Sequence, residues 1–431
     1  MFCYQCEQCP SGGCTKIGVC GKDENIASLQ DTIVFGLKGI AAYATHAREL
    51  GFVDAEVDGI VHEALYMTLT NSNFNLSEHI AMAMKVGSAT VKVMDLLDKA
   101  HTSILGVPKP VTVTEDKVEG KCILVTGHNL FALKELLKQT EGKGINIYTH
   151  SEMLPAHGYP ELKKYPHLKG NVGKAWYDQR KVFEEFPGAI LGTTNCLMPI
   201  KGTYADRFFS YGVAGLEGVR KIENNDFTPI IEKALSLPEA NIQSDKTLTT
   251  GYHHMTVLGI APEIIDAVKR GKIKRFFVIA GCDAPGKGGE YYRELALSVP
   301  ENCVILTTSC GKYRFNDHDF GVVPGTNIPR YIDLGQCNNS GSAVKIAVAL
   351  AEAFNCSVND LPLSIVLSWF EQKAVAILLG LFSLGVKDIR IGPKAPEFLS
   401  PGVVKVLQET FGLKLIGDAK TDLQEMLGEQ N

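Results

Sequence analysis

The sequence predicts a multidomain protein of mixed α+β and α/β class. Three observations support this: five cysteines in the first twenty residues, helical spacing of apolar residues from 25 to about 105, and short β-rich runs alternating with helices thereafter. We expect a cysteine loop with a three-helix bundle over residues 1–106, followed by two Rossmann-like α/β domains with parallel sheets over 107–238 and 239–431. A chain of 431 residues is too long for one hydrophobic core.

The helical region divides into three segments. Apolar residues from Leu29 onward recur at helical spacing, and Gly51 marks the expected end of the first helix. A second helix is predicted over roughly 55–70, and Ser77 is the expected N-cap of a third. The stretch GVPKP then marks a boundary, because two prolines so close together do not continue a helix.

The β-rich runs after this boundary predict the strands of the two sheets. In chain order they are CILVT, INIYT, AILGTT, FFVIAG, CVILTTS, YIDLG, DIRIG and LKLIG. Helical segments separate them, which is the pattern of βαβ units.

Composition excludes several classes of function. The net charge is −5, so no basic surface indicates binding to nucleic acid or to an anionic membrane. The longest apolar stretch, AVAILLGLFSLGV, has 13 residues and is too short to span a bilayer. With no signal peptide visible, we expect a soluble cytoplasmic protein whose 12 cysteines serve metal or redox chemistry rather than disulfides. Cys122, Cys303 and Cys356 are expected to be plain buried residues.

Potential metal ligands follow six of the predicted strands, where open α/β sheets build their sites. They are His128, Glu152, Cys196, Cys282, Cys310 and Cys337. Thiolates suit iron–sulfur chemistry, whereas imidazole and carboxylate suit harder iron, so the set suggests a cluster with both sulfide and oxygen character. The alternative is that Glu152 caps or pairs locally and His128 is an ordinary loop histidine.

The N-terminal cysteines allow two metal interpretations. Zinc modules usually show two CxxC pairs with a longer spacer, whereas here one pair precedes two single cysteines. Four ligands in so short a Gly-rich loop favour an iron–sulfur cubane over zinc. The residues concerned are Cys3, Cys6, Cys14 and Cys20, with Cys9 as an extra thiol.

The chain resembles the hybrid-cluster proteins, also called prismane proteins or hydroxylamine reductases, over nearly its whole length. The motifs are MFCYQCEQ, VTGHNL, THSEMLPAHGYP, TTNC, AGCD, TTSCGKYRFN, LGQCNNS, WFEQKAV and SLGVKDIRIGP. The resemblance implies a [4Fe-4S] cluster on Cys3, Cys6, Cys14 and Cys20, serving as the electron inlet. It also implies a hybrid [4Fe-2O-2S] cluster on His128, Glu152, Cys196, Cys282, Cys310, Cys337 and Glu371. In the family the Cys282 position carries a persulfide in one state.

Glu371 and Lys373 enter the site only through the resemblance. By themselves they look like the solvated first turn of a helix. Two departures from the family pattern matter: Cys9 is extra and is expected to be a bystander, and the chain is shorter than many members by about one small helical bundle. The missing bundle would leave surface for a partner, so we expect a homodimer.

The resemblance implies reduction of hydroxylamine to ammonia and water, with electrons from an external donor protein. Proton delivery is expected from Lys373, Glu371, His128 or Glu152, with Lys373 preferred because a lysine desolvated near a cluster can lose its proton. The alternatives are nitric oxide reduction to nitrous oxide in nitrosative-stress defence, an NO-sensing or S-nitrosylating protein, and a zinc-stapled α/β binding protein.

Overall fold

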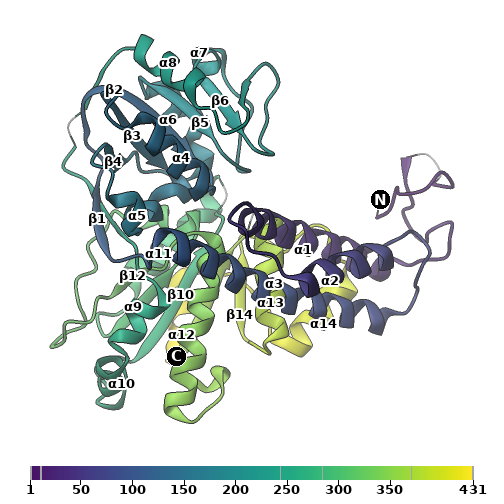
Figure 1. Cartoon of the computed structure of the whole chain (residues 1–431). Coiled ribbons are helices and arrows are strands. Elements are labelled where there is room, and N and C mark those ends of the chain that lie inside the picture. Colours follow the sequence, from purple (N-terminus) through teal and green to yellow (C-terminus); the bar gives the residue numbers. More distant parts are fainter. Residues whose placement is uncertain (1, 10–11, 243, 284, 370, 430–431) are drawn as a thin grey trace.

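The computed structural model describes residues 2–9, 12–242, 244–283, 285–369 and 371–429. Two bodies containing sheets adjoin a group of long helices that extends to one side (Figure 1). The N-terminal segment lies at the outer end of these helices, away from both sheets (Figure 1). The predicted class, a helical N-terminal region followed by two parallel α/β sheets, is confirmed.

Three helices form the N-terminal region, as expected. They are α1 (Glu24–Glu49), α2 (Ala55–Met67) and α3 (Leu76–Leu105). The first backbone N–H groups of a helix have no helical carbonyl to bond. At the starts of α1, α2 and α3, these N–H groups donate to the side chains of Asp23, Asp54 and Asn75. Asn75, rather than the expected Ser77, therefore caps α3, because its side chain accepts from the N–H of Glu78.

The first sheet has the strand order β4-β3-β2-β5-β6-β7, and all of these neighbours are parallel. An additional strand, β8, pairs antiparallel with β2. The strands are β2 (Lys117–Thr126), β3 (Ile145–His150), β4 (Leu168–Asn171), β5 (Ala189–Gly192), β6 (Phe208–Tyr211), β7 (Arg220–Ile222) and β8 (Ala240–Ile242). Their helices are α4 (Leu130–Thr140), α5 (Pro160–Lys163), α6 (Gln179–Glu185), α7 (Gly202–Ala205) and α8 (Thr228–Ser236).

The second sheet has the order β12-β11-β10-β13-β14-β15 and is parallel throughout. Its strands are β10 (Arg275–Gly281), β11 (Cys303–Thr307), β12 (Tyr331–Asp333), β13 (Leu363–Ser368), β14 (Ile389–Gly392) and β15 (Lys414–Leu415). The helices of this part are α9 (His254–Gly259), α10 (Ala261–Lys269), α11 (Glu290–Ser298), α12 (Ser340–Phe354), α13 (Gln372–Ser383), α14 (Pro401–Phe411) and α15 (Ala419–Leu427).

Short elements complete the fold. Strands β1 (Val111–Thr114) and β9 (Thr247–Thr250) form a separate antiparallel pair. The 3-10 turns are η2 (Ser151–Gly158), η3 (Trp176–Asp178), η4 (Lys287–Gly289), η5 (Cys310–Arg314), η6 (Cys337–Asn339) and η7 (Val358–Asp360). Among the described residues, no helix combines the length and apolar character that a membrane crossing requires.

Helix α13 connects the second sheet to the N-terminal helices. A side-chain carbon added at Gly39 of α1 would lie 2.5 Å from Cβ of Ala376, and one added at Gly87 of α3 would lie 2.1 Å from the carbonyl oxygen of Leu379. Only glycine allows helix backbones to approach so closely. The start of α13 is therefore held in one position, and this start carries site residues.

Candidate metal centre

The carboxyl ends of the two sheets meet at a buried cluster of donor atoms. One donor atom from each of His128, Glu152 and Cys337 lies within 4.8 Å of the others, and all three residues are buried. Nε2 of His128 is 3.6 Å from Oε2 of Glu152, and the backbone N–H of Cys337 donates to that same oxygen at 2.8 Å. Glu152 is thus engaged across the two sheets rather than locally.

His128 is held in a single orientation. Its backbone N–H donates to Oγ1 of Thr194 at 2.9 Å, and its Nδ1 lies 2.8 Å from the same oxygen. Its Nε2 lies 3.0 Å from Nζ of Lys373, which can only donate, so Nε2 accepts. Burial, followed by the charges of Lys373 and His46, holds the pKa of His128 well below its usual range. The ring is therefore neutral with a lone pair on Nε2, the form that binds metals.

Glu152 provides a test of whether the site fits a metal. Its Oε1 is buried and has no hydrogen-bond partner among the described residues. Burial raises the pKa of this carboxyl, opposed by the charge of Lys312 and the N–H of Cys337. A buried oxygen without a hydrogen-bond partner lowers the stability of a protein. The buried position of Oε1 is therefore explained if this oxygen binds a ligand.

The four strand-end cysteines follow β5, β10, β11 and β12, and three of them, Cys282, Cys310 and Cys337, are buried. The thiols of Cys196, Cys282 and Cys337 are close enough to influence one another's ionisation, and Cys310 is similarly coupled to Glu152 and Cys196. Burial is the main cause that raises the pKa of each thiol, to about 12 for Cys337. Thiolates here therefore require a further positive charge, which a metal cluster supplies.

Left-handed backbone occurs beside several of these donors. Cys196 itself has φ 70°, Ser309 precedes Cys310 with φ 66°, Asp283 follows Cys282 with φ 59°, and Ser151 precedes Glu152 with φ 56°. Such conformations are costly for residues with a side chain and collect at functional sites. The strand-end loops that carry the donors therefore contain strained backbone, as loops at functional sites do.

Lys373 lies in the centre of the site, not on a solvated turn. Its side chain is 4% exposed, and Nζ contacts Nε2 of His128 at 3.0 Å, Oδ1 of Asn195 at 2.9 Å and Oε1 of Glu371 at 3.8 Å. Burial lowers the pKa of this lysine, but the charges of Cys337 and Glu371, among others, outweigh it and raise the pKa above its ordinary value. The expectation that Lys373 loses its proton beside a bound cluster stays a prediction.

Hydrogen bonds from further residues support the sulfur atoms. The hydroxyl of Tyr43 donates to Sγ of Cys337 at 3.3 Å, and Oγ of Ser151 lies 2.8 Å from Sγ of Cys310. Nδ2 of Asn195 donates to Sγ of Cys196 at 3.4 Å. None of these three side chains is among the site residues predicted from the sequence, and Tyr43 had no local signal because it lies in the middle of a helix.

Glu371 was predicted as a site residue only from the family resemblance and not from the strand pattern, for an identifiable reason. Glu371 follows β13 (Leu363–Ser368), one of the two central strands of the second sheet, which was absent from the predicted runs. Recognition of LSIVLS as a strand would have given Glu371 the same strand-end position as the other six donors.

The N-terminal cysteines form a compact loop. Cys3 and Cys14 pair as an isolated antiparallel bridge, in which the N–H of Cys14 donates to the carbonyl of Cys3 at 2.6 Å. Besides desolvation, the charges of Cys14, Cys6 and Cys3 raise the pKa of the Cys9 thiol, so this thiol lies near these three. Sγ of Cys20 instead lies 3.9 Å from the carbonyl oxygen of Thr70.

A second trio, Asp98, His253 and His254, is balanced without a metal. Nδ1 of His253 accepts from the N–H of Met255, so the ring proton is on Nε2, which donates to Asp98 at 2.8 Å. Lys345 also pairs with Asp98 at 3.2 Å. The ammonium group of Lys345 and the protonated Nε2 of His253 therefore already pair with the Asp98 carboxylate that a metal would need.

Comparison with known proteins identifies relatives along the entire chain. The model of the Prismane/CO dehydrogenase family matches residues 1–80 and 49–424. A protein of Moorella thermoacetica named hydroxylamine reductase is 61% identical over 429 residues, covering 99% of this chain and 100% of the relative. A protein of the same name from Geobacter metallireducens is 50% identical over 407 residues, which are 94% of this chain but 74% of that longer relative.

Solved structures with the same fold are more distant in sequence. Carbon monoxide dehydrogenase IV from Carboxydothermus hydrogenoformans superposes with a TM-score of 0.78 at 15% identity, covering 99% of this chain and 92% of the other. The sequence motifs, the two-sheet architecture and the matched relatives agree. The chain belongs to the Prismane/CO dehydrogenase family.

Proposed function

We propose that this protein is an iron–sulfur oxidoreductase that reduces hydroxylamine to ammonia and water. The observation that carries the proposal is the buried set of one imidazole, carboxylates and thiols at the meeting sheet ends, in which Oε1 of Glu152 has no partner among the described residues. The name of relatives 50–61% identical over 99% of the chain supports the substrate.

The proposed metal ligands follow the expectation from the sequence. A hybrid [4Fe-2O-2S] cluster would be held by His128, Glu152, Cys196, Cys282, Cys310, Cys337 and Glu371, with Cys282 as a persulfide in one state. A [4Fe-4S] cluster would be held by Cys3, Cys6, Cys14 and Cys20. Bound there, the hybrid cluster would supply electrons and Lewis acidity that weakens the N–O bond. We also propose that an external protein donates the electrons and that this protein forms a homodimer. Light scattering tests the oligomeric state.

The protein groups contribute protons and orientation. Reduction of hydroxylamine breaks one N–O bond, consumes two electrons and two protons, and releases ammonia and water. An ammonium has three N–H donors. One of those of Lys373 donates to Oδ1 of Asn195, which holds Nζ in place, and the donor that faces Nε2 of His128 would become free for the substrate when that lone pair binds the metal. Asn195 is exposed, so protons can return to Lys373 from solvent on this side.

Anaerobic purification with iron and sulfide analysis tests the cofactors. We expect about eight irons per chain, four for each cluster, with sulfide below iron and two EPR signals on stepwise reduction. Cys282→Ser should lose iron, whereas Cys356→Ser, which changes a half-buried thiol outside the site, should keep it. Zinc without iron would contradict the proposal, and so would a cubane signal alone.

Turnover assays test the activity. Hydroxylamine should be reduced, and Lys373→Gln should lower kcat by about 100-fold or more while iron content stays unchanged. Full turnover in Lys373→Gln would refute the role of Lys373. A second candidate activity is reduction of two nitric oxide molecules, with two electrons and two protons, to nitrous oxide and water. Apolar cavities beside the site favour it as an additional substrate.

A further inference from the structure

Gln336 forms hydrogen bonds between the two sheets at the candidate metal centre. It lies in the loop after β12 of the second sheet, directly before Cys337, and is 1% exposed. Its Nε2 donates to the carbonyl oxygen of His128 at 3.1 Å and to that of Glu152 at 2.8 Å. Both of these residues follow strands of the first sheet. One amide group from the second sheet thus bonds the backbones of two proposed ligands from the first.

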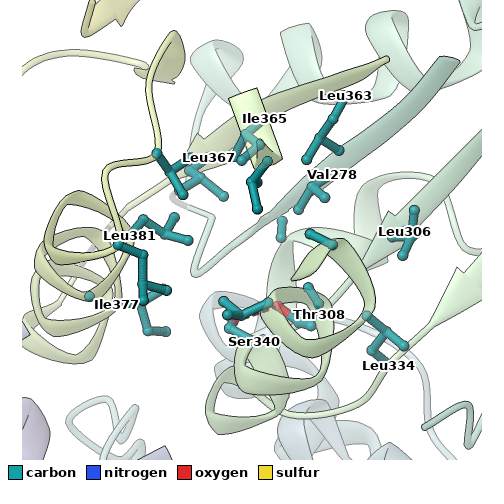
Figure 2. Close-up of a pocket in the computed structure, with 18 of the residues that line it drawn as sticks. Val278, Leu306, Thr308, Leu334, Ser340, Leu363, Ile365, Leu367, Ile377 and Leu381 are labelled. Atoms are coloured by element: carbon teal, nitrogen blue, oxygen red, sulfur yellow. Dashed lines mark hydrogen bonds between the residues drawn. The ribbon is translucent and has the colours of Figure 1, made fainter. Parts of the chain in front are cut away.

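The loop that carries Gln336 is fixed to the second sheet. The backbone N–H of Leu334 donates to the carbonyl oxygen of Thr307 at the end of β11, at 2.9 Å. Leu334 and Ser340, on either side of the loop, line an apolar cavity of about 130 Å³ beside the sheet (Figure 2). The hydroxyl oxygen of Ser340 also lies 3.2 Å from that of Thr308. Gln336 therefore reaches toward the first sheet from a firmly attached loop.

The turn over residues 335–339 orients the side chain of Gln336. The backbone N–H of Gln336 donates to Oδ1 of Asn339 at 2.9 Å, and the carboxamide oxygen of Gln336 accepts from the N–H of Asn339. Gly335 has φ 120°, and a side-chain carbon there would lie 2.6 Å from Oδ1 of Asn339, so the turn requires glycine. Because the turn engages the carboxamide oxygen, the amide presents its two N–H groups to the first sheet.

The carbonyl groups of His128 and Glu152 lie where the first sheet stops supplying donors. The parallel ladder between β2 and β3 ends two residues before each of them. Glu152 lies in the 3-10 turn η2, where its carbonyl would accept from the N–H of residue 155, but Pro155 has no N–H. Buried carbonyl groups need hydrogen-bond donors. Gln336 supplies one to each carbonyl.

The same turn also holds the carboxylate of Glu152. Cys337, the next residue after Gln336, donates its backbone N–H to Oε2 of Glu152 at 2.8 Å. This bond engages one carboxylate oxygen, whereas Oε1 has no hydrogen-bond partner among the described residues. Gln336 and Cys337 therefore hold both the carbonyl and the carboxylate of Glu152, and together they fix the direction of Oε1.

We propose that Gln336 is a positioning residue that sets the separation between the first-sheet ligands His128 and Glu152 and the second-sheet ligand Cys337, so that one cluster can bind all three. Their donor atoms lie within 4.8 Å of one another, and metal–ligand distances hold to within about 0.2 Å. A small shift between the sheets would therefore break the set. The hydrogen bonds stand on the geometry alone, and their effect on a cluster rests on the proposed function.

Gln336→Met tests this role, because it keeps the length of the side chain but removes both N–H donors. Gln139→Met is the matched control. In α4, Nε2 of Gln139 donates to the carbonyl oxygen of Asn225 at 2.7 Å, and its Oε1 accepts from the N–H of Phe227 at 3.0 Å. Both variants lose the bonds between one glutamine and the backbone, so both should have a lower denaturant midpoint. Only Gln336→Met should change the metal centre.

Iron analysis and EPR of the anaerobically purified variants measure this change. In Gln336→Met, we expect the signal of the hybrid cluster to be lost or to move to different g-values, with the signal of the N-terminal cluster unchanged. Iron should fall from about eight toward about four per chain where the hybrid signal is lost. Gln139→Met should keep full iron and both signals. If Gln336→Met does not fold, Gln336→Asn, whose amide is one methylene shorter, should give the same result. Full iron with an unchanged hybrid signal would overturn the proposal.

Hydrogen–deuterium exchange of the full-length protein tests the contacts apart from the metal. Cys282→Ser, which should already lose iron from this site, is compared with the double variant that also carries Gln336→Met. The second change should speed exchange of the Cys337 N–H roughly tenfold or more, because Glu152 is no longer held. Adding Gln139→Met instead should leave this rate unchanged. Equal rates with and without Gln336→Met would overturn the positioning role. Failure of the proposed function is recognised separately, as an unaltered protein without iron in which Gln336→Met still speeds this exchange.

Discussion

Gly39→Ala should displace the start of α13 and with it Lys373. The added Cβ would lie 2.5 Å from Cβ of Ala376, 3.1 Å from the carbonyl oxygen of Gln372 and 3.2 Å from Cα of Lys373. Carbon atoms in contact prefer about 3.5–4.0 Å, so α13 must retreat by about 1 Å. The first turn of α13 carries Lys373, whose Nζ donates to Oδ1 of Asn195 at 2.9 Å, so this hydrogen bond should lengthen beyond hydrogen-bond reach.

Two measurements follow from this displacement. Overpacking should lower the free energy of unfolding by about 1–3 kcal/mol, partly offset by the better helix propensity of alanine. A misplacement of about 1 Å should lower kcat for hydroxylamine by up to roughly 100-fold while iron content is kept.

Gly59→Ala is the matched control. Gly59 lies inside α2, and no heavy atom lies within 4 Å of an added Cβ, so this change should stabilise the protein by about 0.5–1 kcal/mol with unchanged turnover. Measurements of the denaturant midpoint and of kcat for both variants test these expected changes in stability and turnover. A Gly39→Ala protein as stable and active as the unaltered one would refute the packing argument.

Three further changes test the cluster ligands, the sulfur environment and the buried histidines. Cys20→Ser should remove about four irons whereas Cys9→Ser keeps them, and the reverse result in iron analysis would make Cys9 the ligand. Tyr43→Phe removes the O–H donor 3.3 Å from Sγ of Cys337, so the reduction potential should fall in an EPR-monitored titration, because negative charge on the reduced centre loses a stabilising hydrogen bond; an unchanged potential would contradict this. Burial lowers the pKa of His157 to about 4, below the unfolded value, so the unfolded state binds a proton first as pH falls and stability decreases with it. In urea unfolding this histidine should cost about 2 kcal/mol between pH 7 and pH 5. The cost should be absent in His157→Gln, and an equal pH dependence in that variant would contradict the assignment.

The fold was predictable because its main signals are local. Apolar periodicity distinguishes the long helices, and seven of the eight predicted β-rich runs coincide with strands that end in turns or helices. The eighth, LKLIG, contributes only the two-residue β15. Strand β13 was missed because LSIVLS, a short apolar run in a buried parallel sheet, cannot be distinguished from a helix segment by periodicity, and a helix follows it closely. Missing β13 also removed one donor, Glu371. The predicted runs lacked six other strands as well, namely β1, β4, β6, β7, β8 and β9.

The surroundings of Lys373 could not be predicted from neighbouring residues. The sequence EQK before an apolar run is typical of an exposed helix start, and its burial depends on α1 and α3 packing against α13. The glycines that permit this packing, such as Gly39 and Gly87, are separated from α13 by hundreds of residues. Likewise the pKa of Lys373 depends on acidic groups from other loops, whose charge outweighs desolvation.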